Sequence, residues 1–254
     1  MNGQKLRVLD LFSGIGGFSL GLEGAGGFET VAFCEIEPYC RRVLAKHWPG
    51  VPCYDDVRNL TADTLRRDGI AVDVICGGFP CQDISVANVT GKGLAGERSG
   101  LWREYARLVR EIRPQFVVIE NVAALLGRGL GDVLGDVSES GYDAEWFALP
   151  ASALGAPHQR DRLWIVAYPG GSGREGHHSI TSILERRAAA FTVDRNPFSD
   201  AWRALDGGFA DLRTGDGLSV VVDRHRVKAL GNAVVPQIPE LIGRAIMQAE
   251  GIAA

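Results

Sequence analysis

Short apolar runs alternate along the chain with longer amphipathic segments, and this alternation indicates the fold. The short runs have the length of strands and end at glycine, proline or polar residues. They cover Arg7–Phe12, Phe28–Cys34, Val72–Cys76, Phe116–Glu120, Tyr142–Leu149 and Leu163–Tyr168. Helices are expected at Pro38–Trp48, Leu101–Ile112, Gly131–Glu139 and Pro236–Ala249. Strands that alternate with helices predict an α/β fold with a doubly wound, mostly parallel sheet.

The same pattern divides the chain into three regions. Residues 1–168 carry the alternating strands and helices, whereas residues 169–223 contain scattered aromatic and charged residues without clear periodicity. Residues 224–254 return to a helical pattern. We therefore expect a principal domain of residues 1–168, a small irregular segment of 169–223, and a C-terminal segment that returns to the principal domain.

The composition is that of a soluble globular protein, since 46% of the residues are hydrophobic and 23% are charged. No apolar run reaches the length of a membrane span, and Met1–Phe12 lacks the pattern of a secretory signal. The five cysteines include no Cys-x-x-Cys pair, and the histidines share no metal-ligand spacing with them. No metal is therefore expected, and free thiols fit a reducing cytoplasm.

The net charge of −4 does not by itself indicate a nucleic-acid-binding protein. Arginines recur from residue 91 onward, whereas the first 90 residues are more acidic. Two interpretations remain open. The arginine-rich part binds nucleic acid, or its arginines lie on ordinary solvated helices.

Polar residues follow the ends of four expected strands. These residues are Ser13-Gly14, Glu35, Pro80-Cys81 and Glu120-Asn121. Ligands of doubly wound sheets bind outside the carboxyl ends of the strands. We therefore expect these loops to converge on one edge of the sheet.

The first two loops indicate a nucleoside ligand. Glycines in Asp10–Gly17 let the backbone approach a ligand closely, although a tight structural turn would use the same residues. The dinucleotide fingerprint is incomplete because its third glycine is missing. Glu35 is placed to accept hydrogen bonds from a ribose diol, or else it is a solvated loop acid. Together they favour an adenosine-containing ligand.

The remaining loops contain candidate catalytic groups. Cys81 follows a proline turn and is placed as a nucleophile, although it could equally be a small buried residue. Glu120 follows an apolar run, so its carboxyl is expected to have a raised pKa and to donate a proton; alternatively it caps a helix. Arg160 and Arg162 share one face of an extended segment, where they bind a common target or lie in a solvated turn.

In their order along the chain, these motifs resemble those of the DNA cytosine-5 methyltransferase family, of the short bacterial or phage type. The matching segments are Asp10–Gly17, Glu35, Gly78–Gln82, Glu120–Val122, Arg160–Arg162 and Leu230–Pro236. The resemblance covers residues 6–168 and 224–248. It implies a Rossmann-like methyltransferase domain with a short target-recognition region at 169–223.

The resemblance also implies S-adenosylmethionine as the methyl donor. In the family, the glycine loop holds the methionine portion, an acid at the Glu35 position binds the ribose, and the Asp56-Val57 segment reads the adenine edge. The implied cofactor-binding residues are Phe12, Gly14, Gly16, Gly17, Glu35, Ile36, Asp56, Val57, Pro80, Leu101, Asn232 and Val234. Ile36 stands where the family often has an aromatic residue, so stacking on the adenine is expected to be weaker.

The family chemistry gives each catalytic candidate a role. Cys81 would add to C6 of a cytosine flipped out of the duplex, and Glu120 would hydrogen-bond at N3. Arg162 would hold the cytosine O2, with Arg160 in support. Contacts to DNA are expected at Ser85, Arg98, Arg195 and Arg203.

Three features depart from the family pattern. His158 intervenes before Gln159, Ile84 replaces a common aromatic, and the region of 169–223 is short for target recognition. Two alternatives follow. The first is a tRNA cytosine-5 methyltransferase, although that branch carries a Cys-Phe-Thr segment that is missing before the C-terminal motif here. The second is a decayed, non-catalytic DNA-binding member of the family.

The expected setting is the cytoplasm of a bacterial or phage-infected cell. There a monomer would act on double-stranded DNA in restriction-modification or in protection of phage DNA. A cognate restriction endonuclease is a possible further partner.

Overall fold

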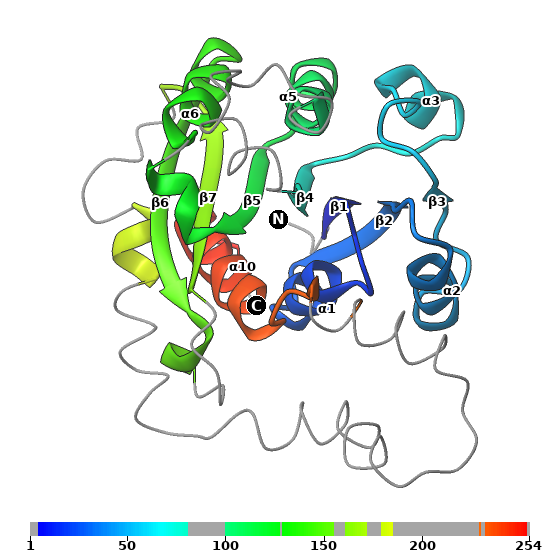
Figure 1. Cartoon of the computed structure of the whole chain (residues 1–254), viewed down its shortest axis with the longest axis horizontal. Helices are drawn as coiled ribbons and strands as arrows, with labels where there is room; N and C mark the ends of the chain where they lie inside the picture. Colours follow the sequence, from blue (N-terminus) through cyan, green and yellow to red (C-terminus); the bar gives the residue numbers. More distant parts are fainter. Residues whose placement is uncertain are drawn as a thin grey trace, which may run out of the picture.

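A seven-stranded sheet organises the part of the chain that the computed structural model describes, which is residues 5–80, 100–127, 129–154, 161–171, 179–184, 229 and 232–252. The strands lie in the order β3-β2-β1-β4-β5-β7-β6 (Figure 1). Their bounds are β1 Leu6–Leu11, β2 Phe28–Cys34, β3 Cys53–Tyr54, β4 Val74–Gly78, β5 Phe116–Val122, β6 Tyr142–Pro150 and β7 Asp161–Pro169.

The sheet is mostly parallel, as the sequence pattern predicts. The strands from β3 through β5 pair in parallel, so their carboxyl ends share one edge. β7 inserts between β5 and β6 and is antiparallel to both. The start of β7 therefore lies beside the end of β5, which brings Arg162 to the edge where the loops converge.

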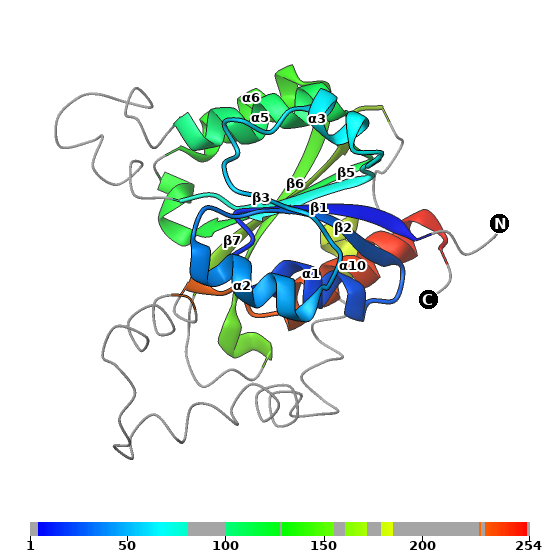
Figure 2. The same ribbon diagram turned by 90° about the vertical axis from the view of Figure 1, so that its right-hand side faces the viewer.

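Helices cover both faces of the sheet and give a three-layered arrangement (Figure 2). One face carries α1 (Gly17–Gly24), α2 (Pro38–His47) and α10 (Gln237–Glu250), and the other carries α3 (Ala62–Arg67), α5 (Gly100–Ile112) and α6 (Leu130–Glu139). Two short 3-10 helices, η1 (Ala123–Gly127) and η2 (Ala151–Leu154), are also present. The elements expected from the sequence begin and end within two residues of these bounds. None of the described helices has both the length and the apolar character needed to span a membrane.

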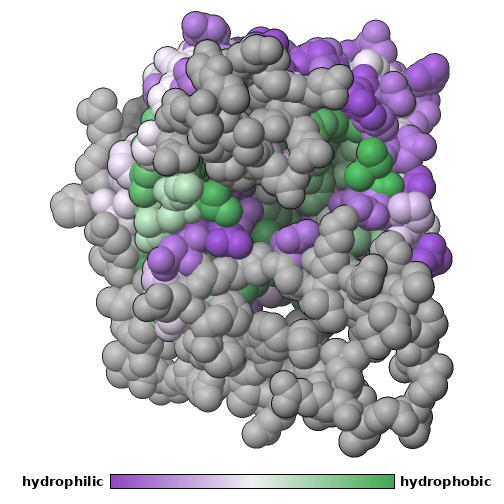
Figure 3. Space-filling model, viewed as in Figure 1, coloured by the Kyte–Doolittle hydropathy of each residue, from purple (hydrophilic) through white to green (hydrophobic). Residues whose placement is uncertain are grey.

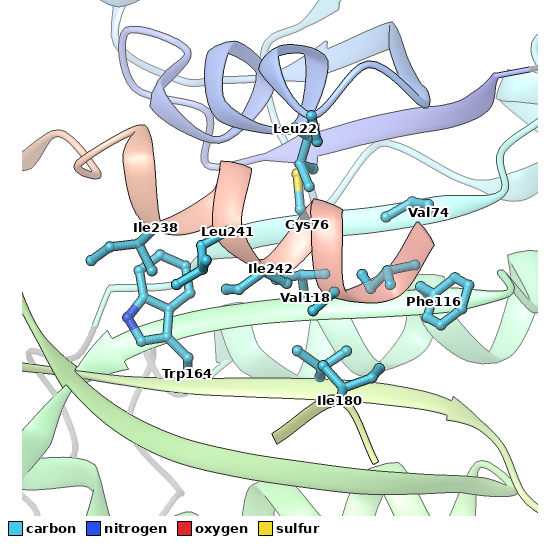
Figure 4. Packing of buried hydrophobic residues seen from close by; sticks show 14 of the residues in the cluster. Leu22, Val74, Cys76, Phe116, Val118, Trp164, Ile180, Ile238, Leu241 and Ile242 are labelled. Atoms are coloured by element: carbon cyan, nitrogen blue, oxygen red, sulfur yellow. The ribbon is translucent and has the colours of Figure 1, made fainter. Parts of the chain in front are cut away.

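Each face of the sheet buries its own hydrophobic cluster. On the first face, Ile238, Leu241 and Ile242 of α10 pack over Trp164 of β7 and Val118 of β5 (Figure 4). Burying one such side chain stabilises a fold by about 1.5–3 kcal/mol. The helix near the end of the chain is therefore part of the same core as the N-terminal strands, and it packs directly against α1.

The chain after β7 is also joined to this core. Residues 180–184 are helical, and Ile180, Ile183 and Leu184 are buried in the first cluster. The Glu145 carboxylate of β6 accepts hydrogen bonds from the backbone amides of Ile180 (3.0 Å) and Thr181 (2.8 Å) at the start of this helix. Burial raises the pKa of Glu145, but the hydrogen bonds from Ser179 and Thr181 outweigh burial and lower it. An ionised carboxylate thus caps the helix.

Candidate active site

The loop after β1 depends on its glycines. Gly14 and Gly16 have φ angles of 55° and 88°, in the left-handed region that residues with a Cβ rarely adopt. A Cβ on Gly16 would lie 2.5 Å from the Trp48 ring, and one on Gly17 would lie 2.5 Å from the carbonyl oxygen of Val234. The loop therefore passes from β1 into α1 with its backbone pressed against α2 on one side and the C-terminal segment on the other.

Glu35 is fixed at the end of β2 beside this loop. One carboxylate oxygen accepts from the Gly14 amide and the other from the Glu37 amide, both at 2.7 Å. The residue is only 8% exposed. Because each carboxylate oxygen has two lone pairs, the group can accept two further hydrogen bonds without giving up these two. A carboxylate that can accept two more hydrogen bonds fits the two neighbouring hydroxyls of a ribose, which would donate them.

Three of the expected cofactor-binding residues belong to one hydrophobic cluster. Val57 is buried in the cluster on the second face, and Phe12 and Leu101 pack against it half-exposed. The Phe12 ring stacks on Tyr105 with centroids 6.4 Å apart. The structure thus places on the same face of the sheet residues that are 45 and 44 positions apart in the chain (12 to 57 and 57 to 101). Ile36, the residue after Glu35, is 62% exposed and offers an apolar surface to a ligand.

Asp56 precedes Val57 and is held in place locally. Its carboxylate accepts from the Arg58 backbone amide at 3.0 Å and from the Arg58 guanidinium at 2.9 Å. The hydrogen bond from the Arg58 side chain lowers the pKa of Asp56, so the group is anionic at neutral pH. A carboxylate in this position can accept a hydrogen bond from an exocyclic amine.

The C-terminal segment lies against the glycine loop. Val234 is half-buried and its backbone carbonyl faces Gly17, while Asn232 is exposed two residues earlier. A Cβ on Gly21 would similarly lie 2.1 Å from the carbonyl oxygen of Pro236. Two glycines of α1 therefore allow the chain at residues 234–236 to lie directly on the helix.

The other half of the site lies where β4 and β5 end. Gly78 pairs with Glu120, and a Cβ on Gly78 would lie 2.6 Å from a Glu120 carboxylate oxygen. Beyond Gly78, the Phe79 carbonyl accepts a 3.1 Å hydrogen bond from the Asn121 side chain, which is only 2% exposed. Pro80 is exposed and leads directly to position 81. The missing side chain at Gly78 leaves room for the Glu120 carboxylate, and the Asn121 amide fixes the backbone at Phe79, two positions before Cys81.

Glu120 forms an ion pair with Arg162, the first pairing of two sequence-predicted catalytic residues. Nε of Arg162 lies 2.7 Å from a Glu120 oxygen, and the side chains are 22% and 13% exposed. The strands place them there because Val122 of β5 pairs with Arg162 of β7. The antiparallel pairing of β5 and β7 thus joins an acid and a cation that stand 42 positions apart in the sequence.

A buried acid lies beneath the glycine loop. Asp10, on β1, is fully buried and accepts a 2.8 Å hydrogen bond from Ser19 of α1. Burial raises its pKa to about 8 against the opposing hydrogen bonds from Ser19 and Cys76. The sequence placed Asp10 at the start of the loop motif but gave it no role, because an acid inside a strand cannot be assigned a partner from spacing alone.

Several predicted residues lie outside the described part of the chain. These are Cys81, Ser85, Arg98, Arg160, Arg195 and Arg203. Asn121 and Gly78 are the functional candidates to which sequence reasoning gave no role, although both stood in the quoted motifs. Within the described ranges, His, Cys, Asp and Glu side chains form no group of three that could hold a metal ion. In the view of Figure 3, hydrophobic residues lie on both sides of a hollow in the middle of the molecule, and hydrophilic residues lie along part of its lower edge.

Comparisons with known proteins account for most of the chain. The family model described as C-5 cytosine-specific DNA methylase matches residues 6–194. The Type II methyltransferase M2.BsuMI of Bacillus subtilis (strain 168) is 36% identical over 171 residues, which are 64% of this chain and 42% of that protein. The Type II methyltransferase M.CviJI of Paramecium bursaria Chlorella virus IL3A is 34% identical over 194 residues, which are 76% of this chain and 50% of that protein. The chain thus spans half or less of the length of these curated relatives.

Two solved structures have the same fold. The Entamoeba histolytica methyltransferase EhMeth superposes with a TM-score of 0.66 at 15% identity, covering 96% of this chain and 98% of that one. A mutant of Spodoptera frugiperda DNMT2 superposes with a TM-score of 0.58 at 16% identity, covering 98% of each chain. At these identities the likeness is one of fold.

Proposed function

The chain belongs to the C-5 cytosine-specific DNA methylase family, and from that premise we propose that it transfers a methyl group from S-adenosylmethionine to C5 of cytosine in double-stranded DNA. The observation that supports this most directly is the Glu120–Arg162 ion pair. It lies at the carboxyl edge of the sheet, next to the Phe79-Pro80 segment that leads into Cys81. An acid and a cation therefore lie where a doubly wound sheet binds its ligands, beside the segment from which the chain continues to the expected nucleophile.

The other half of this edge fits S-adenosylmethionine. The Glu35 carboxylate would accept hydrogen bonds from the two ribose hydroxyls, and Asp56 would accept one from the adenine amine. The adenine and the methionine portion would contact Phe12, Gly14, Gly16, Gly17, Ile36, Val57, Pro80, Leu101, Asn232 and Val234. When bound, this cofactor supplies a methyl group made electrophilic by its sulfonium.

Cys81 would make cytosine reactive toward that methyl group. C5 of cytosine is too electron-poor to attack a sulfonium directly. Addition of the Cys81 thiolate to C6 would form an Sγ–C6 bond and move the electron pair of the C5–C6 double bond to C5. C5 would then attack the methyl group, whose bond to the sulfonium sulfur breaks, and S-adenosylhomocysteine would leave. A base removes the C5 proton, the electron pair re-forms the double bond, and the thiolate leaves.

Glu120 and Arg162 would hold the base during these steps. Arg162 would donate to the cytosine O2 while its Nε stays on one oxygen of the Glu120 carboxyl, and the other oxygen would carry a proton and donate it in a hydrogen bond to N3. Both contacts strengthen as charge develops on the ring, so they lower the barrier to thiolate addition. Arg160 would support Arg162 from two positions earlier.

The target base must leave the duplex, since C6 is inaccessible inside a base stack. Ser85, Arg98, Arg195 and Arg203 are the residues proposed to contact DNA. The domains proposed are residues 1–168 for catalysis and cofactor binding, 169–223 for target recognition, and 224–254 returning to the catalytic domain.

The biological role that fits is restriction-modification or the protection of phage DNA, because M2.BsuMI and M.CviJI are both named Type II methyltransferases. In that role the enzyme would act as a monomer in the cytoplasm, and a cognate restriction endonuclease would cut the same site when it is unmethylated.

One experiment separates this function from its two alternatives. Wild-type protein and the Cys81→Ser variant are incubated with labelled S-adenosylmethionine and either duplex DNA or tRNA. We expect label in DNA with the wild type and none with Cys81→Ser. Label in tRNA alone would identify an RNA methyltransferase, and cofactor binding without any transfer would identify a non-catalytic DNA-binding protein.

A second measurement tests the covalent step. A duplex with 5-fluorocytosine at the target position cannot lose its C5 substituent as a proton, so the enzyme should remain bonded to it through Cys81. The adduct should survive denaturing electrophoresis and should be missing with Cys81→Ser. An active preparation that forms no adduct would refute the nucleophilic role.

A further inference from the structure

All three nitrogens of the Arg107 guanidinium on α5 donate hydrogen bonds. Nη2 donates to the backbone carbonyls of Val57 (3.1 Å) and Leu60 (2.8 Å). Nε donates to Glu104 at 2.7 Å, and Nη1 donates to Glu111 at 2.8 Å. One cation therefore connects two carboxylates on its own helix to two carbonyls on a separate turn.

The turn that Arg107 contacts runs from Val57 to Leu60 and directly follows Asp56. It has little other support from the sheet, because β3 before it is only two residues long, Cys53–Tyr54. After the turn, the Ala62 amide at the start of α3 donates to the second carboxylate oxygen of Glu111 at 3.1 Å. Helix α5 thus contacts the backbone of this turn at three points between residues 57 and 62.

The geometry requires arginine. A planar guanidinium offers five N–H donors in a fixed fork, so it can bridge carbonyls and carboxylates that lie on different sides. A lysine ammonium is a compact charge and cannot span both sets at once. Burial lowers the pKa of Arg107, but the hydrogen bonds to Glu111 and Glu104 outweigh it and raise the pKa, so the group stays charged.

We propose that Arg107 is a positioning residue that sets the place of the adenine-reading segment Asp56-Val57 through the carbonyls of Val57 and Leu60. The proposal rests on the proposed function, because it takes this segment as the adenine site. The same helix begins at Gly100, so it also carries Leu101, a second wall of that site. Helix α5 therefore fixes two sides of the adenine pocket relative to each other, and Arg107 makes the connection.

The test measures recognition of the adenine separately from folding. Arg107→Met keeps the length of the side chain but removes the donors, Arg107→Lys keeps the charge, and Arg110→Met is the matched control on an exposed position of the same helix. For each protein, Kd is measured by calorimetry for S-adenosylhomocysteine and for S-inosylhomocysteine, in which the adenine amine is replaced by oxygen. KM for S-adenosylmethionine and kcat are measured on duplex DNA.

We expect the wild type and Arg110→Met to prefer S-adenosylhomocysteine over its inosine analogue. In Arg107→Met this preference should fall and the Kd for S-adenosylhomocysteine should rise roughly tenfold or more, the order that a hydrogen bond from a charged donor contributes. KM for S-adenosylmethionine should rise in parallel while kcat at saturation changes little. Arg107→Lys should restore part of the loss.

The outcomes are distinguishable. If the wild type binds neither nucleoside, the proposed function fails and the adenine site falls with it. If the wild type prefers S-adenosylhomocysteine and Arg107→Met keeps both its affinity and its preference, the positioning role is overturned while the proposed function stands. If Arg107→Met does not fold, Arg107→Lys decides: a reduced preference supports the role, and a wild-type preference refutes it.

Discussion

The side chain of Asn121 donates a 3.1 Å hydrogen bond to the backbone carbonyl of Phe79, and this bond joins the end of β5 to the chain that leads into Cys81. Asn121 is almost fully buried, and its own side-chain oxygen accepts from the Val122 amide at 2.8 Å. Both ends of the amide are therefore used. The backbone two positions before the expected nucleophile is thus held by this side chain to the strand that carries the expected acid.

Replacing Asn121 by alanine should loosen that segment. The Phe79 carbonyl would lose its donor in a buried place, which costs about 1–3 kcal/mol of stability. We expect kcat for methyl transfer to fall at least about tenfold, because the nucleophile is then less well oriented, while KM for S-adenosylmethionine stays near wild type. Denaturant unfolding and steady-state kinetics measure the two effects. Asn121→Asp, which places an anion against the carbonyl, should be no better than alanine; normal kcat in both variants would contradict the role.

Glu120 and Arg162 should behave as a unit. Each alanine substitution alone is expected to lower the single-turnover rate of methyl transfer by about 10²–10⁴, the range for loss of one acid–base group. The double variant should be scarcely slower than either single variant, because removing one partner already disables the other. Glu139→Ala, at an exposed position of α6, is the control. Rate losses that multiply in the double variant would mean that the two residues act independently.

Gly17 should not tolerate a side chain. A Cβ there would lie 2.5 Å from the Val234 carbonyl oxygen, so Gly17→Ala must push the C-terminal segment away from α1. We expect a loss of about 1–3 kcal/mol in unfolding free energy and weaker binding of S-adenosylhomocysteine by calorimetry. Gly131→Ala is the matched control, because its Cβ meets open space on α6 and alanine favours a helix by up to about 1 kcal/mol. Equal effects of the two substitutions would exclude a specific contact at Gly17.

Asp10 should make stability depend on pH. Burial raises its pKa from 3.8 to about 8. Between these values the carboxyl is ionised in the unfolded chain and protonated in the folded one, so folding takes up a proton and stability falls as pH rises, by at most about 1.4 kcal/mol per pH unit. Asp10→Asn resembles the protonated acid but does not titrate.

The measurement is the free energy of unfolding in urea between pH 5 and pH 8 for both proteins. The wild type should lose stability with rising pH relative to Asp10→Asn, and the difference between the two curves isolates this one group. Parallel curves would show that Asp10 does not take up a proton on folding over this pH range, which would contradict the raised pKa.

Much of the fold could be predicted from the sequence, because strands and helices that are buried on one side repeat hydrophobic residues at a regular spacing. All strands of the sheet except β3, and the helices α2, α5, α6 and α10, were expected within two residues of their bounds. The short strand β3 was missed, since two residues show no periodicity. Helix α1 was not expected as a helix because its eight residues include three glycines, which weaken helix formation. Two of those glycines, Gly17 and Gly21, let residues 234–236 lie against the helix. Packing against this segment stabilises a helix that its own residues favour only weakly.

The sequence by itself determined which residue types stand after each strand: the glycine loop, Glu35, Glu120-Asn121 and the segment before Cys81. Only the tertiary structure decided which of them touch. The antiparallel insertion of β7 beside β5 pairs Glu120 with Arg162, and the fold also joins Asn121 to Phe79 and Arg107 to the turn after Asp56. The physical reason is that periodicity reports local backbone geometry and burial, whereas contacts between residues 42 to 50 positions apart depend on the order in which the strands pair.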